Sequence, residues 1–411
     1  MLPLINITGG SSRPADTRSK EPKLYDVPKT CDVHAELVHL DVLRGVAALA
    51  VFLGHLRTFV FVPYSDLSSH NPINAAVWII SGFGHQAVMV FFVLSGFFIT
   101  KSALQDDAKH RFSWQTFLIK RLSRLWVVLI PCLLLTAYWD QIGRHYSASG
   151  FYEGKLYSLY NSMSPGGVTL DASTFFGNVL FLQTIKTPIF GSNGPVWSLA
   201  NEWWYYILFL FVFMIIRNRH GNIPVQLARL LALALVCAFV GDYILIPGAI
   251  WLLGALSFIV VDRNYCKGIL RNPWMRVFAF VALGLALGFS KSSFGADAAK
   301  DYAVGIAATL VALVLATMQG GGALYARLSK LIAESSYTLY LAHFPFIAVV
   351  VDMVLLNRKF DATPGGYAVF ALVGGLTLTY CYGVYWLFER HTGAVRRYCL
   401  NKLTSRRVAV P

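Results

Sequence analysis

The chain is dominated by apolar segments that are long enough to cross a lipid bilayer. These segments recur along nearly the whole sequence after residue 38, and a transmembrane helix needs about 17 to 25 such residues. Of the 411 residues, 56% are hydrophobic and 14% are charged, whereas a soluble domain carries roughly a quarter charged residues. We therefore expect an all-α protein, a polytopic bundle of transmembrane helices.

The hydropathy pattern predicts about ten transmembrane spans. Two further apolar pieces are too short to cross. Residues 75–83 lead into the second span, and residues 174–185 are expected to form an interfacial or re-entrant element. The predicted spans are residues 40–61, 84–100, 117–138, 196–216, 226–240, 243–261, 275–290, 302–318, 336–356 and 366–387.

The distribution of Lys and Arg predicts the orientation of these spans. With the N-terminus in the cytoplasm, 26 of the 35 basic residues fall in inner segments, seven in outer loops and two within the first span. This asymmetry follows the positive-inside rule and favours an even number of spans with both termini cytoplasmic. Because the loops carry the net charge of +14, the charge does not indicate a nucleic-acid partner, and membrane lipid is the expected one.

Three parts of the chain are expected. Residues 1–38 are predicted to be a disordered cytoplasmic leader, residues 39–390 a single membrane domain, and residues 391–411 a basic cytoplasmic tail. The leader lacks a short apolar core before a cleavage site, so it does not resemble a signal peptide. The six cysteines are scattered and show no C-x-x-C spacing, which indicates neither a disulfide framework nor a metal site.

A polar stripe interrupts the first predicted span. On an α-helix, the eleven steps from Arg44 to His55 end about 20° from the starting direction and advance about 16 Å. Asp41 falls within about 40° of His55 by the same geometry, and it either pairs with Arg44 or takes part in substrate binding. In lipid such a stripe must face protein or water, and ionisable groups within spans are usually functional.

A basic vestibule is expected at the inner ends of the spans. Arg121 and Arg124 lie three residues apart on one helical face at the inner mouth of the third span. Arginines can grip a phosphate with forked hydrogen bonds, so they suit a phosphate-bearing ligand, although they are also typical positive-inside anchors. The other residues predicted to bind this ligand at the inner end are Arg44, Ser95, Tyr340 and His343.

An acid/base site is expected nearer the outer surface. His55 and Glu202 each lie about six residues, or about 9 Å, from the outer end of a predicted span, so they are expected to pair. A neutral imidazole beside a carboxylate can act as general base toward a hydroxyl. Trp197, Trp203 and Trp204 at the outer boundary are expected to form an interfacial belt first and to stack on a sugar second.

Five motifs in this order resemble the membrane acyltransferase 3 family. The resemblance implies transfer of an acyl group, commonly acetyl from acetyl-CoA, to hydroxyls of carbohydrates. It also implies functional roles for Arg44 with His55, for the arginine pair, and for Glu202. The motifs are Leu-Asp-Val-Leu-Arg-Gly before His55, Phe91-Phe-Val-Leu-Ser-Gly-Phe97, Arg121-x-x-Arg124, Trp197-Ser-Leu before Glu202, and Ser336-Tyr-Thr-Leu-Tyr-Leu-Ala-His343.

One departure from the family pattern lies at Phe388-Glu-Arg-His391, where Pro is expected shortly after Glu, and it affects only the C-terminal boundary. The expected activity is transfer from cytoplasmic acyl-CoA to an extracytoplasmic or lipid-linked saccharide, with His55 as general base, in a bacterial inner membrane. No metal cofactor is expected. The alternatives are a transporter or flippase without chemistry, and an acyl shuttle that serves a separate transferase. A covalent intermediate on Ser95 is disfavoured against direct transfer.

Overall fold

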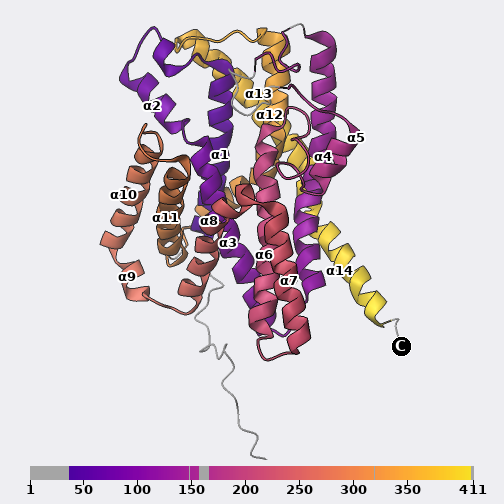
Figure 1. Ribbon diagram of the computed structural model, residues 1–411. Coiled ribbons are helices and arrows are strands. Elements are labelled where there is room, and N and C mark those ends of the chain that lie inside the picture. Colours follow the sequence, from indigo (N-terminus) through magenta and orange to yellow (C-terminus); the bar gives the residue numbers. More distant parts are fainter. Residues whose placement is uncertain (1–36, 148, 157–165, 319, 409–411) are drawn as a thin grey trace, which may run out of the picture.

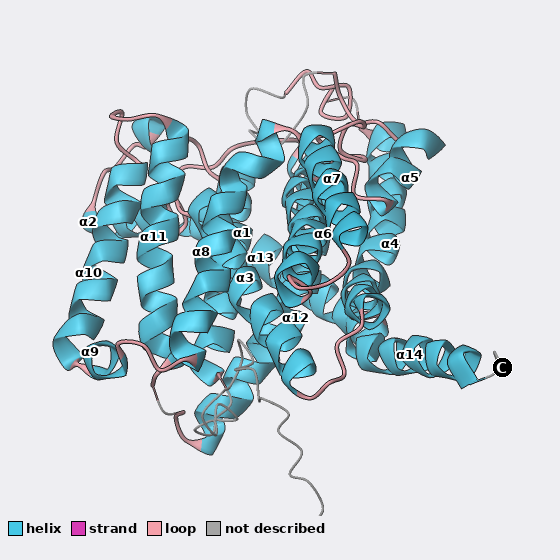
Figure 2. Cartoon of the chain, turned by 60° about the horizontal axis from the view of Figure 1, so that its bottom comes forward, coloured by secondary structure: helices cyan, strands magenta, loops and turns pink. Residues whose placement is uncertain are grey.

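The computed structural model describes residues 37–408 except 148, 157–165 and 319, so the predicted leader lies almost entirely outside the described residues. The described part is built from helices and has isolated bridges but no β-strand (Figures 1 and 2). The α-helices are α1 Val38–Val60, α2 Pro72–Ile80, α3 Gly84–Ala108, α4 Trp114–Tyr146, α5 Ala172–Val179, α6 Trp197–Arg217, α7 Ile223–Val240, α8 Asp242–Asp262, α9 Lys267–Arg271, α10 Pro273–Ser290, α11 Asp297–Ala316, α12 Ala323–Leu355, α13 Pro364–Leu387 and α14 Thr392–Val408.

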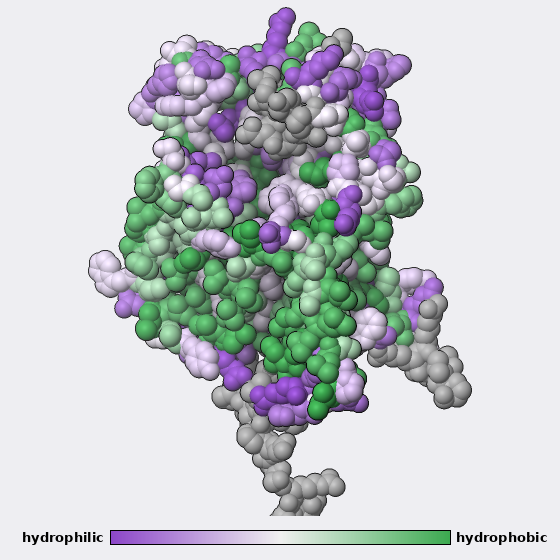
Figure 3. All heavy atoms as spheres, viewed as in Figure 1, coloured by the Kyte–Doolittle hydropathy of each residue, from purple (hydrophilic) through white to green (hydrophobic). Residues whose placement is uncertain are grey.

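The long helices form a multi-pass membrane bundle. Nine helical stretches in the described residues are long and apolar enough to cross a bilayer, and each of the ten predicted spans coincides with a helix. The span predicted at 117–138 falls in α4, which is not among those nine. Figure 3 shows the surface that results, an apolar belt around the middle with hydrophilic residues gathered at both ends.

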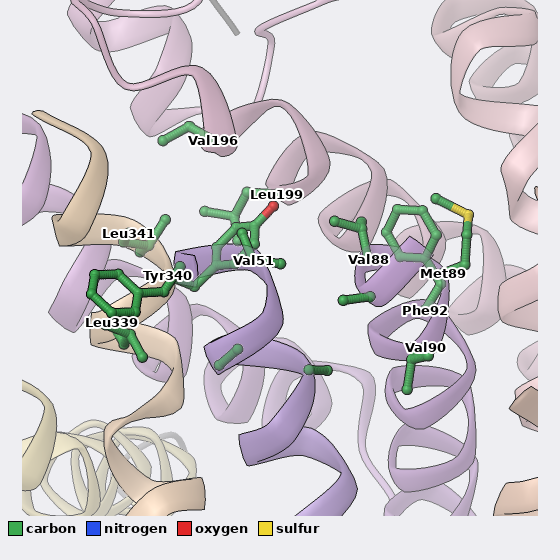
Figure 4. Packing of buried hydrophobic residues seen from close by; sticks show 14 of the residues in the cluster. Val51, Val88, Met89, Val90, Phe92, Val196, Leu199, Leu339, Tyr340 and Leu341 are labelled. Carbon is green, nitrogen blue, oxygen red and sulfur yellow. The ribbon is translucent and has the colours of Figure 1, made fainter. Parts of the chain in front are cut away.

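Helix α1 lies at the centre of the bundle, packed against α3 and α12. The backbones of α3 and α8 come unusually close, because a Cβ added at Gly96 would lie 2.1 Å from the Trp251 carbonyl oxygen. A Cβ at Gly254 would likewise lie 2.0 Å from the carbonyl of Val93. Figure 4 shows apolar side chains of this core, including Val51 of α1, which belongs to the same buried cluster as Tyr340 of α12.

Helix α6 begins inside the protein. The residues of the 3₁₀ turn before it, Gly194–Val196, are all buried. The turn is held from two sides, since Asn193 donates to the Leu341 carbonyl oxygen at 2.8 Å and Ser192 donates to Asp140 through both its backbone N–H and its hydroxyl, each at 2.6 Å. These bonds fix the first turn of α6 well below the end of the bundle.

The short apolar segment predicted at 174–185 overlaps α5, which has eight residues and begins after a cap by Asp171. The side chain of Asp171 accepts hydrogen bonds from the backbone and hydroxyl of Thr174, at 2.8 and 2.7 Å, and together with Ser173 these donors hold the pKa of Asp171 well below its usual range. A helix of this length cannot cross a bilayer, as the sequence predicted.

Helix α12 is much longer than the span predicted at 336–356, because it begins at Ala323 and runs for 33 residues. At 1.5 Å per residue, Tyr340 and His343 lie about 26 and 30 Å from its start. They are therefore deep in the bundle, and the prediction that places them near the inner surface is wrong. The tail predicted at 391–411 folds in part as α14, which extends away from the bundle (Figures 1 and 2).

Candidate active site

A cavity of about 1180 Å³ opens at one end of the bundle. The ends of α1, α3, α6, α8 and α11 form its walls together with the middle of α12 and parts of the segment 166–195. We call it the outer cavity, since it lies at the end that the charge distribution predicts to be extracytoplasmic. Its lining includes His55, Thr58, His85, Trp197, Asp301 and Tyr340.

The imidazole of His55 faces this cavity and packs against a second histidine. Its ring centre lies 5.4 Å from that of His343 and 5.0 Å from that of Phe344. His343 is fully buried, and its Nδ1 lies 2.7 Å from the Leu339 carbonyl oxygen. Since a carbonyl only accepts, His343 is protonated on Nδ1, and its buried Nε2, which has no hydrogen-bond partner among the described residues, is the acceptor.

The expected pair of His55 and Glu202 does not form. Glu202 instead accepts hydrogen bonds from the hydroxyls of Ser95, at 3.2 Å, and Tyr206. Ser95 also accepts one from the indole N–H of Trp251 at 3.1 Å. The prediction assumed that α6 starts at the membrane surface. Because α6 starts deeper, Glu202 lies beside Ser95, which was expected at the inner end.

Arg124 lies near this network without a direct partner. Its charge interacts with Glu202, Tyr206, Tyr337 and Glu389. The side chain is nevertheless exposed, and among the described residues it makes no ion pair or hydrogen bond. A guanidinium that has no direct partner and lies among groups from three other elements is available to bind an anion.

Arg44 belongs to the same charged cluster, which contains Arg124, Glu202 and Glu389, but unlike Arg124 it has direct partners. It forms an ion pair with Asp41 at 3.0 Å and lies 3.5 Å from the Ala333 carbonyl oxygen. Its Nε is buried without a partner among the described residues, and its charge also interacts with Arg124 and Glu202. Asp41 is thus explained by pairing with Arg44, one of its two expected roles.

Arg121 differs from Arg124 in its surroundings. Its side chain is buried, and its guanidinium lies 4.7 Å from the centre of the Phe117 ring. The face of an aromatic ring attracts a cation, so this contact fixes Arg121 against its own helix. The two arginines therefore lie in different environments despite their spacing.

Glu389 is a site residue that the sequence reasoning missed. Its carboxylate accepts hydrogen bonds from the backbone N–H of Thr338 at 3.0 Å and from the Thr338 hydroxyl at 2.6 Å. Its charge interacts with those of Arg44 and Arg124. The sequence Phe388-Glu-Arg-His391, where the family pattern has this Glu, indicates the residue, but by itself it predicts only where the domain ends. The carboxylate joins the end of α13 to the middle of α12.

The aromatic residues expected to contact a sugar separate into two groups. Trp197 lines the outer cavity. In contrast, Trp203 stacks on Phe181 with ring centres 5.0 Å apart, and Trp204 donates its indole N–H to the Phe181 carbonyl oxygen at 2.9 Å. These two rings secure the segment before α6.

Tyr340 lies between the outer cavity and the start of α6. Its hydroxyl is 2.7 Å from that of Ser198 and 2.9 Å from the carbonyl oxygen of Pro195. Tyr340 lines the outer cavity, so it lies with His55 instead of with the arginines.

Comparison with known proteins agrees with this architecture. A family model described as an acyltransferase domain matches residues 37–386. The acyltransferase MdmB of Streptomyces mycarofaciens is 29% identical over 202 residues, which are 47% of this chain and 44% of the relative. An O-acetyl transferase of Shigella phage Sf6 is 26% identical over 173 residues, 41% of this chain and 43% of the relative. The chain thus spans less than half the length of these curated relatives.

No solved structure matches the chain. The family model covers nearly all of the described bundle and includes all the site residues predicted from the sequence, and it ends before Glu389. With its apolar helices long enough to cross a bilayer, the protein is a multi-pass membrane protein that belongs to the acyltransferase 3 family.

Proposed function

We propose that this protein is an integral membrane O-acyltransferase that moves an acyl group, most simply acetyl, from acyl-CoA to a hydroxyl of a saccharide. The observation that carries the proposal is the position of His55 on the wall of the outer cavity, with no hydrogen-bond partner among the described residues and with His343 beside it. A base must have a free nitrogen within reach of the substrate hydroxyl. The acyltransferase and O-acetyl transferase names of the relatives support the reaction class.

Three residues have distinct parts in the proton transfer. In the proposed reaction, a rotation of the neighbouring His55 ring lets Nε2 of His343, which has no partner among the described residues, accept a hydrogen bond from one N–H of His55. The other nitrogen of His55 is then unprotonated. That nitrogen takes the proton of the acceptor hydroxyl. The oxygen bonds to the thioester carbonyl carbon, the carbon–sulfur bond breaks, and the proton passes to the CoA thiolate. Phe344, packed on the His55 ring, keeps the ring in place.

The donor is held from the opposite side of the bundle. Arg124 and Arg44 bind phosphate groups of acyl-CoA, and Glu202 and Glu389 hold these arginines by charge. Arg44 and His55 are on one continuous helix, about 16 Å apart along its axis, a separation comparable with the reach of a long thioester arm. This arrangement suits a cytoplasmic donor and an extracytoplasmic or lipid-linked acceptor in a bacterial inner membrane.

In this proposal Glu202 is a positioning residue and not the base. Its carboxylate accepts hydrogen bonds from Ser95 and Tyr206, and it is not among the residues that line the outer cavity. Glu202 makes no hydrogen bond to His55, so the imidazole has no carboxylate partner among the described residues. The ionisable side chain that packs against the His55 ring is therefore His343.

The test is a reaction with purified protein in detergent, acetyl-CoA and extracted surface glycans. We expect CoA release that depends on added glycan, together with glycans that carry the acyl mass. Release without acylated glycan would favour the acyl shuttle. Absence of release would favour a transporter and contradict the proposal.

A further inference from the structure

The outer cavity contains a second ionisable pair, on the wall where α3 and α11 meet. Nε2 of His85 lies 2.9 and 3.1 Å from the two carboxylate oxygens of Asp301. Both residues line the cavity, and their side chains are 53% and 23% exposed. A carboxylate only accepts, so the ring donates from Nε2. When the ring carries this one proton, Nδ1 is an acceptor, and it has no partner among the described residues.

A purely structural role explains this pair poorly. Ion pairs with this much exposure typically contribute about 0 to 1 kcal/mol to stability. Two other carboxylates of the lining have a local reason for their positions, because Asp242 and Asp297 are the first residues of α8 and α11 and complement the helix dipoles. Asp301 lies one turn further into α11 and is bonded to a different helix.

Trp197 completes a set of groups on the same wall. Its ring is nearly parallel to that of His85, at an interplanar angle of 18° and a centre distance of 6.2 Å. Its indole N–H has no hydrogen-bond partner among the described residues, although those of Trp126, Trp204 and Trp251 have one. The wall thus presents an aromatic face, a free N–H donor and two kinds of acceptor.

We propose that His85, Asp301 and Trp197 form the subsite that holds the acceptor sugar, and that the subsite recognises a vicinal diol. Nδ1 of His85 and a carboxylate oxygen of Asp301 accept from adjacent hydroxyls, while the ring of Trp197 packs on the apolar face of the pyranose. The indole N–H lies in the plane of that ring and donates to an oxygen of the neighbouring part of the saccharide. The inference rests on the proposed function and names its acceptor chemistry. The three residues are positioning residues that turn another hydroxyl toward His55.

Binding of simple sugars tests the subsite without any donor. Saturation-transfer NMR on the detergent-solubilised protein would use methyl α-D-glucopyranoside and methyl α-L-rhamnopyranoside, with their fully O-methylated forms as matched control ligands. We expect binding of at least one free glycoside and none of its methyl ether. Asp301→Asn and His85→Gln should each weaken binding about tenfold or more, the loss expected for one or two hydrogen bonds. Asp66→Asn is the matched control, since this exposed carboxylate lies outside the cavity lining.

A double exchange, His85→Asp with Asp301→His, distinguishes a role in sugar recognition from a role in stabilising the contact between α3 and α11. It restores an ion pair between α3 and α11, so thermal stability should return to the wild-type value while sugar binding stays weak. Restored binding in the exchange, unchanged binding in Asp301→Asn, or a wild type that binds neither glycoside overturns the subsite. Failure of the wild type to release CoA contradicts the proposed function instead, and the binding result can still be read.

Discussion

The imidazole rings of His55 and His343 lie 5.4 Å apart, and they join the first span to the twelfth helix at the wall of the outer cavity. The contact fixes the direction of His55, because His343 is itself held by the Leu339 carbonyl oxygen. A buried histidine with a fixed tautomer is a suitable partner for a base that must keep one nitrogen free.

His343→Ala should lower kcat by about 100-fold, the size expected when a catalytic group loses its orientation. The KM for acyl-CoA should change little, since His343 does not touch the arginine cluster. His343→Gln should recover part of kcat, because its amide oxygen can accept the N–H of His55. Steady-state kinetics and the pH profile of kcat check this, and a loss expressed only in KM would contradict it.

Ser95→Ala should retain activity within about thirtyfold of the wild type, because it removes two hydrogen bonds, to Glu202 and from Trp251, worth roughly 1 kcal/mol each. The measurement is the initial rate, combined with mass spectrometry of protein quenched during turnover. An acyl group on Ser95, together with an inactive alanine variant, would show a covalent route and contradict direct transfer.

Arg124→Ala should raise the KM for acyl-CoA by about 10- to 100-fold, the loss of a charge-assisted hydrogen bond. Arg121→Ala should act mainly on folding, since Arg121 is buried against Phe117. Donor titration and thermal melting of both variants separate the two effects. Equal KM values in Arg124→Ala and the wild type would make Arg124 a topological anchor only.

Lys359 predicts a pH dependence of stability. It donates to the carbonyl oxygens of Thr58 and Phe59 at the end of α1, and burial lowers its pKa to about 8. The ordinary value is 10.5, so between about pH 8 and 10.5 the unfolded chain binds more protons than the folded one, and stability rises with pH over this window. Thermal melting of the wild type relative to Lys359→Met should show this rise. A difference that stays flat or falls would contradict it.

The helices could be predicted because spans are encoded locally, by runs of apolar residues of bilayer length. The depths of polar residues within them could not. The predicted pair of His55 and Glu202 depends on counting residues from assumed helix ends. In the structure, the buried turn Gly194–Val196 places the start of α6 inside the bundle. Helix α12 begins well before the predicted span, and His343 lies deep in the bundle beside His55. Such offsets depend on tertiary packing and not on hydropathy.

The motif residues were found because each stands out in an apolar segment. Glu389 was missed as a site residue because its partners, Thr338 and the charges of Arg44 and Arg124, come from distant parts of the chain. The pair of His85 and Asp301 carries no motif, and only the packing of α3 against α11 brings it together. The contacts between helices therefore determine which ionisable residues become partners, and the sequence alone does not show this.

Acyl transfer by His55→Ala tests the central claim most directly. The purified variant should lose glycan-dependent CoA release by about 10² to 10⁴-fold, the usual contribution of general base catalysis. It should bind acyl-CoA as the wild type does and elute as a folded protein. His145→Ala, which changes an exposed histidine at the end of α4, is the matched control and should keep full activity. Wild-type turnover by a folded His55→Ala protein would contradict the account.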